Sequence, residues 1–403
     1  MKDLRPAMNR TLRYGTLLAG SLLLGACGSD DAPSESELYP TPEFVDVDPS
    51  KTTTQLSGFA WDPEAFFINL VGCPFPDIRC APFLLDEGPL YGFSAVQRSS
   101  IFAFDPITGG PTGDPIQSDE LGVWTLQGVP SRTTVPFFVT SLPTGSLNPA
   151  ANVPPGAYLP TVTLRPVVTH NSVCHVQEAA SISTVGILEA VAKHLTATGS
   201  ATQVADFVDT KKFASVAVFW NYQPGSPLLR APGSCTTVKA TANNAPVGQT
   251  FNVNWAPPGV LPPFLNQSKR GYFVDDQPAT DGSGTKVSGL GITVVLLRAT
   301  TSAPPQEITY TLVDPTPPYD PSHDNLVPDA DPTQAPCALK NRVKERDGRV
   351  KGDQFNPWLF QRIAAPPLPG VITFAGNQMW RRNQPNGPEG ALSPNLCLPL
   401  PPP

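Results

Sequence analysis

Ser118-Asp-Glu-Leu-Gly-Val-Trp-Thr-Leu-Gln-Gly-Val-Pro130 is the stretch that decides the fold of this 403-residue chain. Asp119 and Gly122 are spaced to form a tight turn, in which the aspartate caps backbone amides and the glycine takes a positive φ. Trp124 and Leu126, two residues apart, fall on one face of the following strand and can fill the core of a β-sandwich. The stretch therefore predicts a turn followed by a half-buried strand.

Strand-like segments flank this turn. Residues 52–61, 100–105 and 135–141 are β-prone, and the first alternates apolar with polar side chains. A Leu-Ser-Gly strand, a Phe-Asp strand with a Gly-rich turn and the motif Asp-x-x-Gly-x-Trp-x-Leu-x-Gly-Val-Pro together resemble the carboxypeptidase regulatory-like, or transthyretin-like, domain of bacterial surface proteins. The resemblance covers residues 53–168. It implies a β-sandwich with a structural or binding role and no catalytic residue.

The chain departs from that family in a long Pro-rich insertion, residues 62–97. Beyond the first sandwich, the helical spacing of apolar side chains predicts two short helices between residues 181 and 210 that bury their apolar faces on a sheet. These apolar side chains are Leu188, Val191, Ala192 and Leu195 in the first helix, and Val204, Phe207 and Val208 in the second. Ser200-Ala-Thr-Gln203 has capping-box spacing before the second helix.

A second β-rich region follows the helices, and the Thr-Asp-Gly-Ser-Gly run at 280–284 repeats the turn pattern of residues 118–122. We therefore expect a mainly β protein with one or two transthyretin-like sandwiches, a short helical segment between them and Pro-rich loops. The expected segments are a cleaved signal peptide (1–26), a lipidated spacer (27–50), a first sandwich (51–170), a helical connector (171–212), a second sandwich (213–314), and a Pro-rich C-terminal region with a hairpin (315–403). A degenerate repeat of the first sandwich is one hypothesis for the second.

The N-terminus has the layout of an export signal. Four basic residues precede an uncharged, apolar run from Tyr14 to Ala26, which is too short to span a bilayer. Leu24-Gly-Ala-Cys27 resembles the lipobox of bacterial lipoproteins, which implies cleavage before Cys27 and lipid attachment to its sulfur. The alternative is an ordinary signal peptide whose cysteine later forms a disulfide. Gly28 after the cysteine implies the outer membrane, so we expect a lipid-anchored protein of the bacterial cell envelope.

Composition restricts the partners. The chain has a net charge of −7, and without residues 1–26, which hold four basic residues and one acidic one, 23 basic and 33 acidic residues leave −10. Such a chain is not expected to bind nucleic acid. Its 50 prolines coexist with 20 Phe and 6 Trp, which favours short strands joined by stiff loops over disorder.

Six cysteines follow Cys27, and an even number in an exported chain favours disulfides. The candidates are Cys73, Cys80, Cys174, Cys235, Cys337 and Cys397. Cys73 with Cys80 closes a short loop and is the most direct pairing, whereas proximity alone suggests Cys174 with Cys235 and Cys337 with Cys397. A metal site at Cys174-His175 is disfavoured, because adjacent residues of a strand point to opposite faces.

No motif of a serine hydrolase, zinc protease or P-loop enzyme is present, and the chain has only four histidines. We therefore expect no enzyme and no cofactor. Asp324, Asp329 and Asp331 crowd a loop that could supply oxygen ligands to calcium, although acids in Pro-rich loops are usually solvated turn residues. Six basic residues in the hairpin 340–351 could dock anionic glycans or lipid headgroups, or simply protect a strand edge.

Aromatic side chains around the insertion and the second β region could stack on sugars, although about two-thirds of them should be buried in the core. They are Trp61, Phe66, Phe67, Tyr91, Phe93, Trp255, Phe264, Tyr272 and Phe273. The sequence thus predicts an envelope lipoprotein with a non-enzymatic binding or structural role towards a protein or glycan. The alternatives are a lipid-anchored hydrolase of unrecognised type and a small-ligand carrier or sensor.

Overall fold

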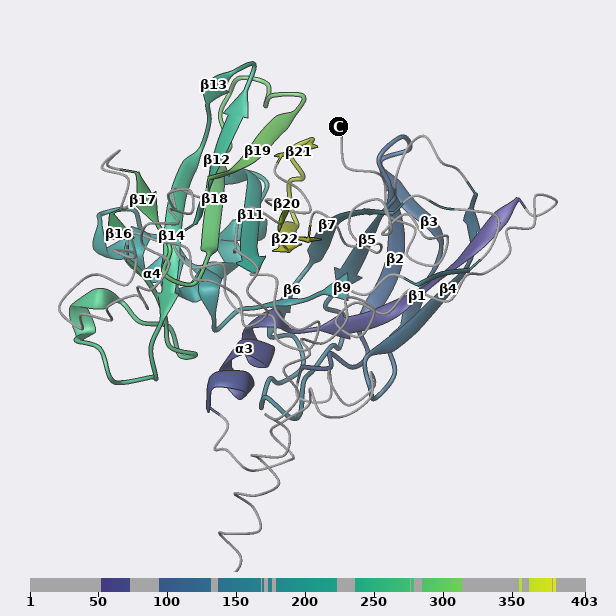
Figure 1. Ribbon diagram of the computed structural model, residues 1–403, viewed down its shortest axis with the longest axis horizontal. Coiled ribbons are helices and arrows are strands. Elements are labelled where there is room, and N and C mark those ends of the chain that lie inside the picture. The colour runs from purple at the N-terminus through teal and green to yellow at the C-terminus, as the bar shows by residue number, and fades with distance from the viewer. Residues whose placement is uncertain are drawn as a thin grey trace, which may run out of the picture.

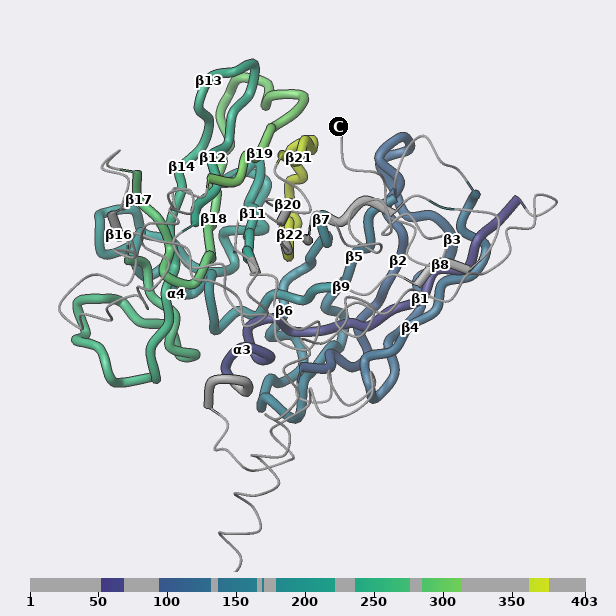
Figure 2. Tube along the Cα trace, in the orientation of Figure 1, coloured from purple at the N-terminus to yellow at the C-terminus, as the bar shows by residue number. Residues whose placement is uncertain are grey.

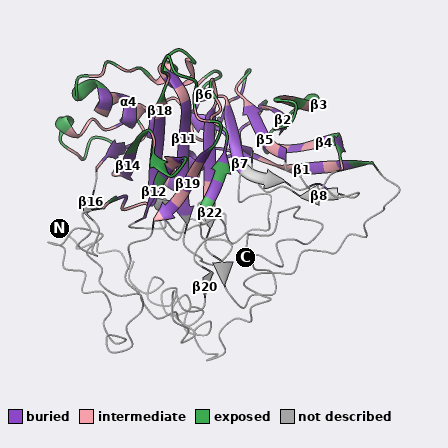
Figure 3. Ribbon diagram, turned by 90° about the horizontal axis from the view of Figure 1, so that it is seen from above, coloured by how far each residue is buried: buried purple, intermediate pink, exposed green. Residues whose placement is uncertain are grey.

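The structure is a computed structural model (Figure 1). It describes residues 52–72, 94–131, 137–167, 169, 173–175, 179–222, 236–275, 277–278, 285–313, 355–356, 362–378 and 380–381. Within these residues the chain is mainly β, with several sheets and few helices, as the sequence predicts. The strands of the largest sheet are mostly buried (Figure 3).

That sheet has nine strands. In order across the sheet they are β15 (Tyr272–Val274), β14 (Gln249–Trp255), β18 (Ile292–Arg298), β11 (Phe213–Tyr222), β22 (Ile372–Gln378), β7 (Thr161–Val167), β5 (Phe137–Leu142), β2 (Ser100–Asp105) and β3 (Gly110–Gln117). Strands of both expected sandwich regions therefore share one sheet. The division of the chain into separate domains stays a prediction.

The C-terminal strand β22 joins the two halves of this sheet (Figure 2). It runs parallel to β11, with Ile372 opposite Val216, and parallel to β7, with Ile372 opposite Thr161. The other neighbours in the sheet are antiparallel. A segment far along the chain therefore supplies the central strand.

The first layer over this sheet follows the sequence prediction. Strand β1 (Thr53–Trp61) pairs antiparallel with β4 (Val123–Pro130) and parallel with β8 (Val173–His175) and β9 (Ala179–Ala180). Asp119 Oδ1 accepts hydrogen bonds from the amides of Leu121 and Val123, both 2.8 Å long, and Gly122 has a φ of 79°. Trp124 and Leu126 are buried in one cluster with Ile101, Phe137 and Val139 of the large sheet. The predicted turn and core strand are confirmed.

A second layer covers another part of the large sheet. Strands β13 (Ala245–Pro246), β12 (Thr237–Ala242), β19 (Ile308–Val313) and β21 (Arg362–Ala365) form a four-stranded sheet in this order. Its buried side chains, Val238 and Tyr310 among them, form one cluster with Phe219 and Val295 of the large sheet. Short strand pairs complete the β structure: β6 (Tyr158–Leu159) with β10 (Ile182–Ser183), β16 (Gln277–Pro278) with β17 (Lys286–Val287), and β20 (Phe355–Asn356) with β23 (Trp380–Arg381).

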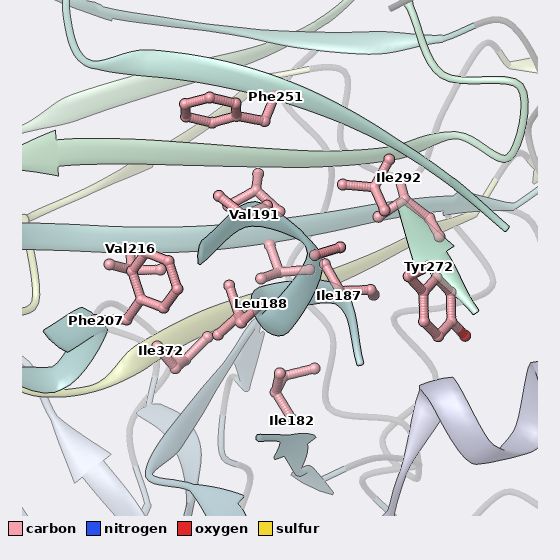
Figure 4. Close-up of a cluster of buried hydrophobic side chains, with 14 of the residues drawn as sticks. Ile182, Ile187, Leu188, Val191, Phe207, Val216, Phe251, Tyr272, Ile292 and Ile372 are labelled. Carbon is pink, nitrogen blue, oxygen red and sulfur yellow. The ribbon is translucent and has the colours of Figure 1, made fainter. Parts of the chain in front are cut away.

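Two short helical segments lie where the sequence predicts them. Helix α4 (Ile187–Ala197) buries Leu188, Val191, Ala192 and Leu195. The second segment is a 3-10 helix, Val204–Val208, and it begins with Asp206 Oδ2 accepting from the amide of Gln203, so the capping contact lies three residues after the predicted start. Their buried side chains belong to one cluster with side chains of β11, β14 and β18, among them Val216 and Ile292, on the face shown in Figure 4.

The insertion after β1 begins with a helix that the sequence prediction missed. Helix α3 (Pro63–Gly72) starts at Asp62, whose Oδ1 accepts from the amide of Ala65 over 2.9 Å. Proline is well tolerated at the first helical position, because that position donates no intrahelical hydrogen bond. The expectation of a Pro-rich loop is therefore wrong for the first ten residues after Asp62.

Candidate functional site

Three charged side chains come together between α3, α4 and β15. Asp62 and Glu64 have fully buried side chains, and that of Arg270 is 10% exposed. Arg270 Nη2 lies 2.8 Å from Asp62 Oδ2, and its Nη1 donates to Asp62 Oδ1 over 3.0 Å and to Glu64 Oε2 over 3.1 Å. One guanidinium therefore pairs with both carboxylates. We call Asp62, Glu64, Arg270, Tyr158 and Ser183 the ionic network.

Local structure places each of these charges. Asp62 and Glu64 lie at the junction of β1 and α3, where Asp62 also caps the helix. Arg270 lies in the turn before β15, which is closed by Ser268 Oγ accepting from the amide of Tyr272 over 2.9 Å. The Arg270 carbonyl accepts from Trp255 Nε1 over 2.7 Å. The arginine is thus fixed from both its backbone and its side chain.

The Glu64 carboxylate lies at the N-terminus of α4. Its Oε1 accepts from the amide of Ile187 over 2.5 Å, and its Oε2 accepts from the amide of Ser183 over 3.1 Å and from its hydroxyl over 2.5 Å. A carboxylate here accepts hydrogen bonds from amides that the helix leaves unpaired, and the positive end of the helix dipole stabilises its negative charge. Gly186 precedes the helix, and a Cβ at this position would collide with the Glu64 carboxylate.

Two tyrosine hydroxyls donate hydrogen bonds to Asp62 and Glu64. Tyr158 donates its hydroxyl to Asp62 Oδ2 over 2.8 Å, and Tyr272 donates its hydroxyl to the Glu64 carbonyl over 3.2 Å. Each carboxylate oxygen of Asp62 and Glu64 therefore accepts at least one hydrogen bond. This is the condition under which buried charges are tolerated in a protein interior.

Burial dominates the electrostatics of the network. It raises the pKa of the Glu64 carboxyl above its ordinary value; Arg270 opposes this shift and Asp62 adds to it. Burial, with the nearby Asp62 charge, also holds the pKa of the Tyr158 hydroxyl well above its usual range. For Arg270 burial opposes the charge, but Asp62 and Glu64 outweigh it and raise the pKa of the guanidinium. Arg270 is therefore a permanent cation between the two acids.

The arrangement of this cluster suits a structural role and not proton transfer. A general acid or base must reach a substrate proton over hydrogen-bond distance. Here the carboxylate oxygens are buried and already bonded to Arg270, Tyr158, Ser183 and main-chain amides. The network instead ties together the end of β1, the start of α4 and the turn before β15, which lie up to 208 residues apart in sequence.

The sequence prediction overlooked this network. Asp62-Pro63-Glu64 carries a readable signal, because an N-cap aspartate followed by proline and an acid is typical of a helix start. Nothing in the sequence near Arg270 indicates its partners, since they lie far away along the chain. Burial of an arginine is decided by the folded structure.

Most of the site residues predicted from sequence lie outside the described residues. These are Cys27, Cys73, Cys80, Cys235, Cys337, Cys397, Asp324, Asp329 and Asp331, with the basic hairpin 340–351. Cys174 lies on β8, where its backbone is opposite Leu56. The lipid anchor, the disulfides and the calcium loop therefore stay predictions. Among the described residues no cluster of His, Cys, Asp or Glu is suited to hold a metal ion, and no helix is long and apolar enough to cross a bilayer.

The aromatic candidates separate clearly. Trp61, Phe67, Tyr272 and Phe273 are buried, Phe66 and Trp255 are half-buried, and Tyr91 and Phe93 lie outside the described residues. Phe264 is 75% exposed. Of the aromatic residues proposed for ligand stacking, Phe264 is thus the one whose ring the described structure presents to solvent.

No protein-family model and no curated protein matches the chain. Solved structures give distant likenesses to pilins. A streptococcal ancillary pilin is 10% identical with a TM-score of 0.17, over 82% of this chain and 63% of the pilin. A variant of the shaft pilin SpaA of Lactobacillus rhamnosus GG is 7% identical with a TM-score of 0.16, over 81% of this chain and 97% of that one. The chain thus spans less than two-thirds of the first pilin, and TM-scores this low support no inference.

Proposed function

We propose that this protein is a lipid-anchored lipoprotein of the bacterial cell envelope with a non-enzymatic binding or structural role towards a protein or glycan. The Leu24-Gly-Ala-Cys27 sequence supports the anchor. The transthyretin-like motif of residues 118–130, with its turn and its core strand, supports a β-sandwich module carried on that anchor.

The observation that carries the non-enzymatic role is the saturation of the ionic network. An enzyme keeps perturbed acids accessible to substrate, because their pKa values serve proton transfer. Here the acid with the raised pKa, Glu64, is fully buried and caps a helix that packs on the large sheet. Its carboxyl oxygens are used for hydrogen bonds that hold Ser183 and the start of α4 in place, which suits a rigid module that presents a surface.

Labelling with radioactive palmitate in the native host tests the anchor. The wild type should incorporate label and Cys27→Ala should not, because the sulfur that would carry the lipid is absent. Cys80→Ala is the matched control and should label like the wild type. Equal labelling of Cys27→Ala and the wild type would refute the anchor.

Activity measurements test the non-enzymatic role. The purified protein and Glu64→Gln should show the same background turnover on ester and glycoside substrates, at a pH where both are folded by circular dichroism. Turnover by the wild type that disappears in folded Glu64→Gln would assign catalysis to the network and overturn the proposal.

A further inference from the structure

An apolar loop connects β14 to β15. The connection runs from residue 256 to 271, and we call its first part, Ala256–Asn266, the apolar loop. Phe264 in this loop is 75% exposed and Val260 is 65% exposed. The end of the molecule that carries α4 has exposed stretches (Figure 3). The turn after the loop packs against α4, where the amide of Lys269 donates to Glu189 Oε2. Val260 and Phe264 are four residues apart in one loop, and apolar side chains that gather in solvent mark interaction sites more often than scattered ones do.

The side chain of Gln267 holds the apolar loop in one shape. Its Oε1 accepts from the amide of Gly259 over 2.9 Å, while its Nε2 donates to the carbonyls of Ala256, over 2.9 Å, and Gly271, over 3.1 Å. Phe264 lies on a short 3-10 helix, Pro263–Leu265. Because the Gln267 side chain fixes the shape of the loop, binding through Phe264 and Val260 costs little conformational entropy.

Few backbone N–H groups of the apolar loop depend on water for a hydrogen bond. Its four prolines, at positions 257, 258, 262 and 263, have no N–H to desolvate. The amides of Gly259, Val260, Leu265 and Asn266 donate within the loop or to Gln267. An N–H group without a partner is costly in an apolar medium, and the prolines and internal hydrogen bonds reduce the number of such N–H groups in this loop.

Two lysines lie close to the apolar loop. Lys193 donates to the Gln267 carbonyl over 2.9 Å with its side chain 42% exposed, while its ion-pair partner Glu189 is 13% exposed. Lys269 is exposed beside it. The surface that carries Phe264 thus suits an anionic partner.

We propose that the apolar loop inserts into the interfacial region of an anionic lipid bilayer. Val260 and Phe264 enter the boundary between headgroups and acyl chains, and Lys193 and Lys269 face the headgroups. Two exposed apolar side chains on a Pro-rich loop can enter a bilayer without a complementary pocket, which favours a bilayer over a protein cleft as the partner. A glycan would need free polar partners, whereas Gln267 is bonded within the loop. The proposal rests on the proposed anchor only because a tether keeps the loop near a membrane.

Flotation with vesicles tests this proposal independently of the lipid anchor. The full chain with Cys27→Ala is mixed with vesicles of phosphatidylcholine and phosphatidylglycerol, or of phosphatidylcholine alone. Adding Val260→Ser and Phe264→Ser should weaken binding to the anionic vesicles about tenfold, because burial of both side chains is lost. Ile107→Ser with Leu121→Ser is the matched control, since these side chains are 65% and 57% exposed elsewhere, and should bind unchanged.

All compared proteins share the same N-terminus, so any contribution from residues 1–27 cancels. Stronger binding to anionic than to neutral vesicles, lost with the loop double variant, supports the proposal. Equal binding by the loop variant and the control would overturn it. So would a concentration-dependent dimer by analytical ultracentrifugation that disappears in the loop variant, because a second copy of the chain would then cover the loop. Palmitate labelling of Cys27 reports on the anchor separately.

Discussion

Arg270 shows how one residue can set the electrostatics of a whole core. Without it, Asp62 and Glu64 would be two carboxylates in a region from which water is excluded, and each would disfavour the charge of the other. With it, both acids keep partners and Glu64 can cap α4. Contacts at the residue scale thus account for the shifted pKa values of Glu64, Tyr158 and Arg270 without a catalytic role.

Arg270→Met should lower the free energy of unfolding by about 3–5 kcal/mol, because it leaves two buried carboxylates without a cation. Urea unfolding at neutral pH measures the change. Lys212→Met is the matched control: its pair with Asp206 has a lysine side chain that is 50% exposed, so the cost should stay below about 1 kcal/mol. Equal effects of the two substitutions would contradict a structural role for the ionic network.

The stability of the wild type relative to Glu64→Gln should rise as the pH falls. The pKa of Glu64 is raised in the folded state, so between its ordinary value of 4.5 and its folded value the native protein binds more protons than the unfolded chain. Within that window acid favours folding through this group, and the contribution disappears above the folded pKa. Unfolding of both proteins by urea along a pH series checks the sign. A difference that is independent of pH would refute it.

Helix α4 shows how a sequence pattern becomes structure at the scale of an element. Its apolar side chains repeat with helical spacing, and the same side chains are buried on the large sheet (Figure 4). The sequence therefore predicts both the helix and its buried face. It does not predict the cap, because the capping carboxylate of Glu64 comes from a segment 123 residues earlier.

Leu188→Ala should destabilise the protein by about 2–5 kcal/mol, because Leu188 is fully buried and its loss leaves a cavity between α4 and the sheet. Thermal or urea unfolding measures the change. Leu121→Ala removes the same atoms from a side chain that is 57% exposed, and its effect should lie within about 0.5 kcal/mol of zero. A small effect of Leu188→Ala would place the helix outside the cooperative core.

At the scale of the whole molecule, the nine-stranded sheet is the organising feature. Strands β11 and β7 come from regions that the sequence divides into different segments, and β22 lies between them. Phe374 on β22 is fully buried in the cluster that also holds α4. Residues 362–378 are therefore part of the fold, although they lie in the segment predicted as a Pro-rich C-terminal region.

The two halves of the sheet should unfold together. Hydrogen exchange should give similar opening free energies for amides of β5 and of β18, which lie on opposite sides of β22. Phe374→Ala should lower both by similar amounts, because the central strand loses packing shared by the sheet. Loss of protection in β18 with none in β5 would show instead that the halves are independent units.

The sequence by itself determined the local features: the turn at Asp119, the core positions of Trp124 and Leu126, the apolar face of α4, and the mainly β class. These depend on alternation, helical spacing and turn chemistry over a few residues. Only the tertiary structure decided that β22 joins the two halves of the sheet and that Arg270 lies between Asp62 and Glu64. The physical reason is range: pairing of distant strands and burial of distant charges depend on contacts across some 200 residues of chain, and such contacts leave no periodic trace in the sequence.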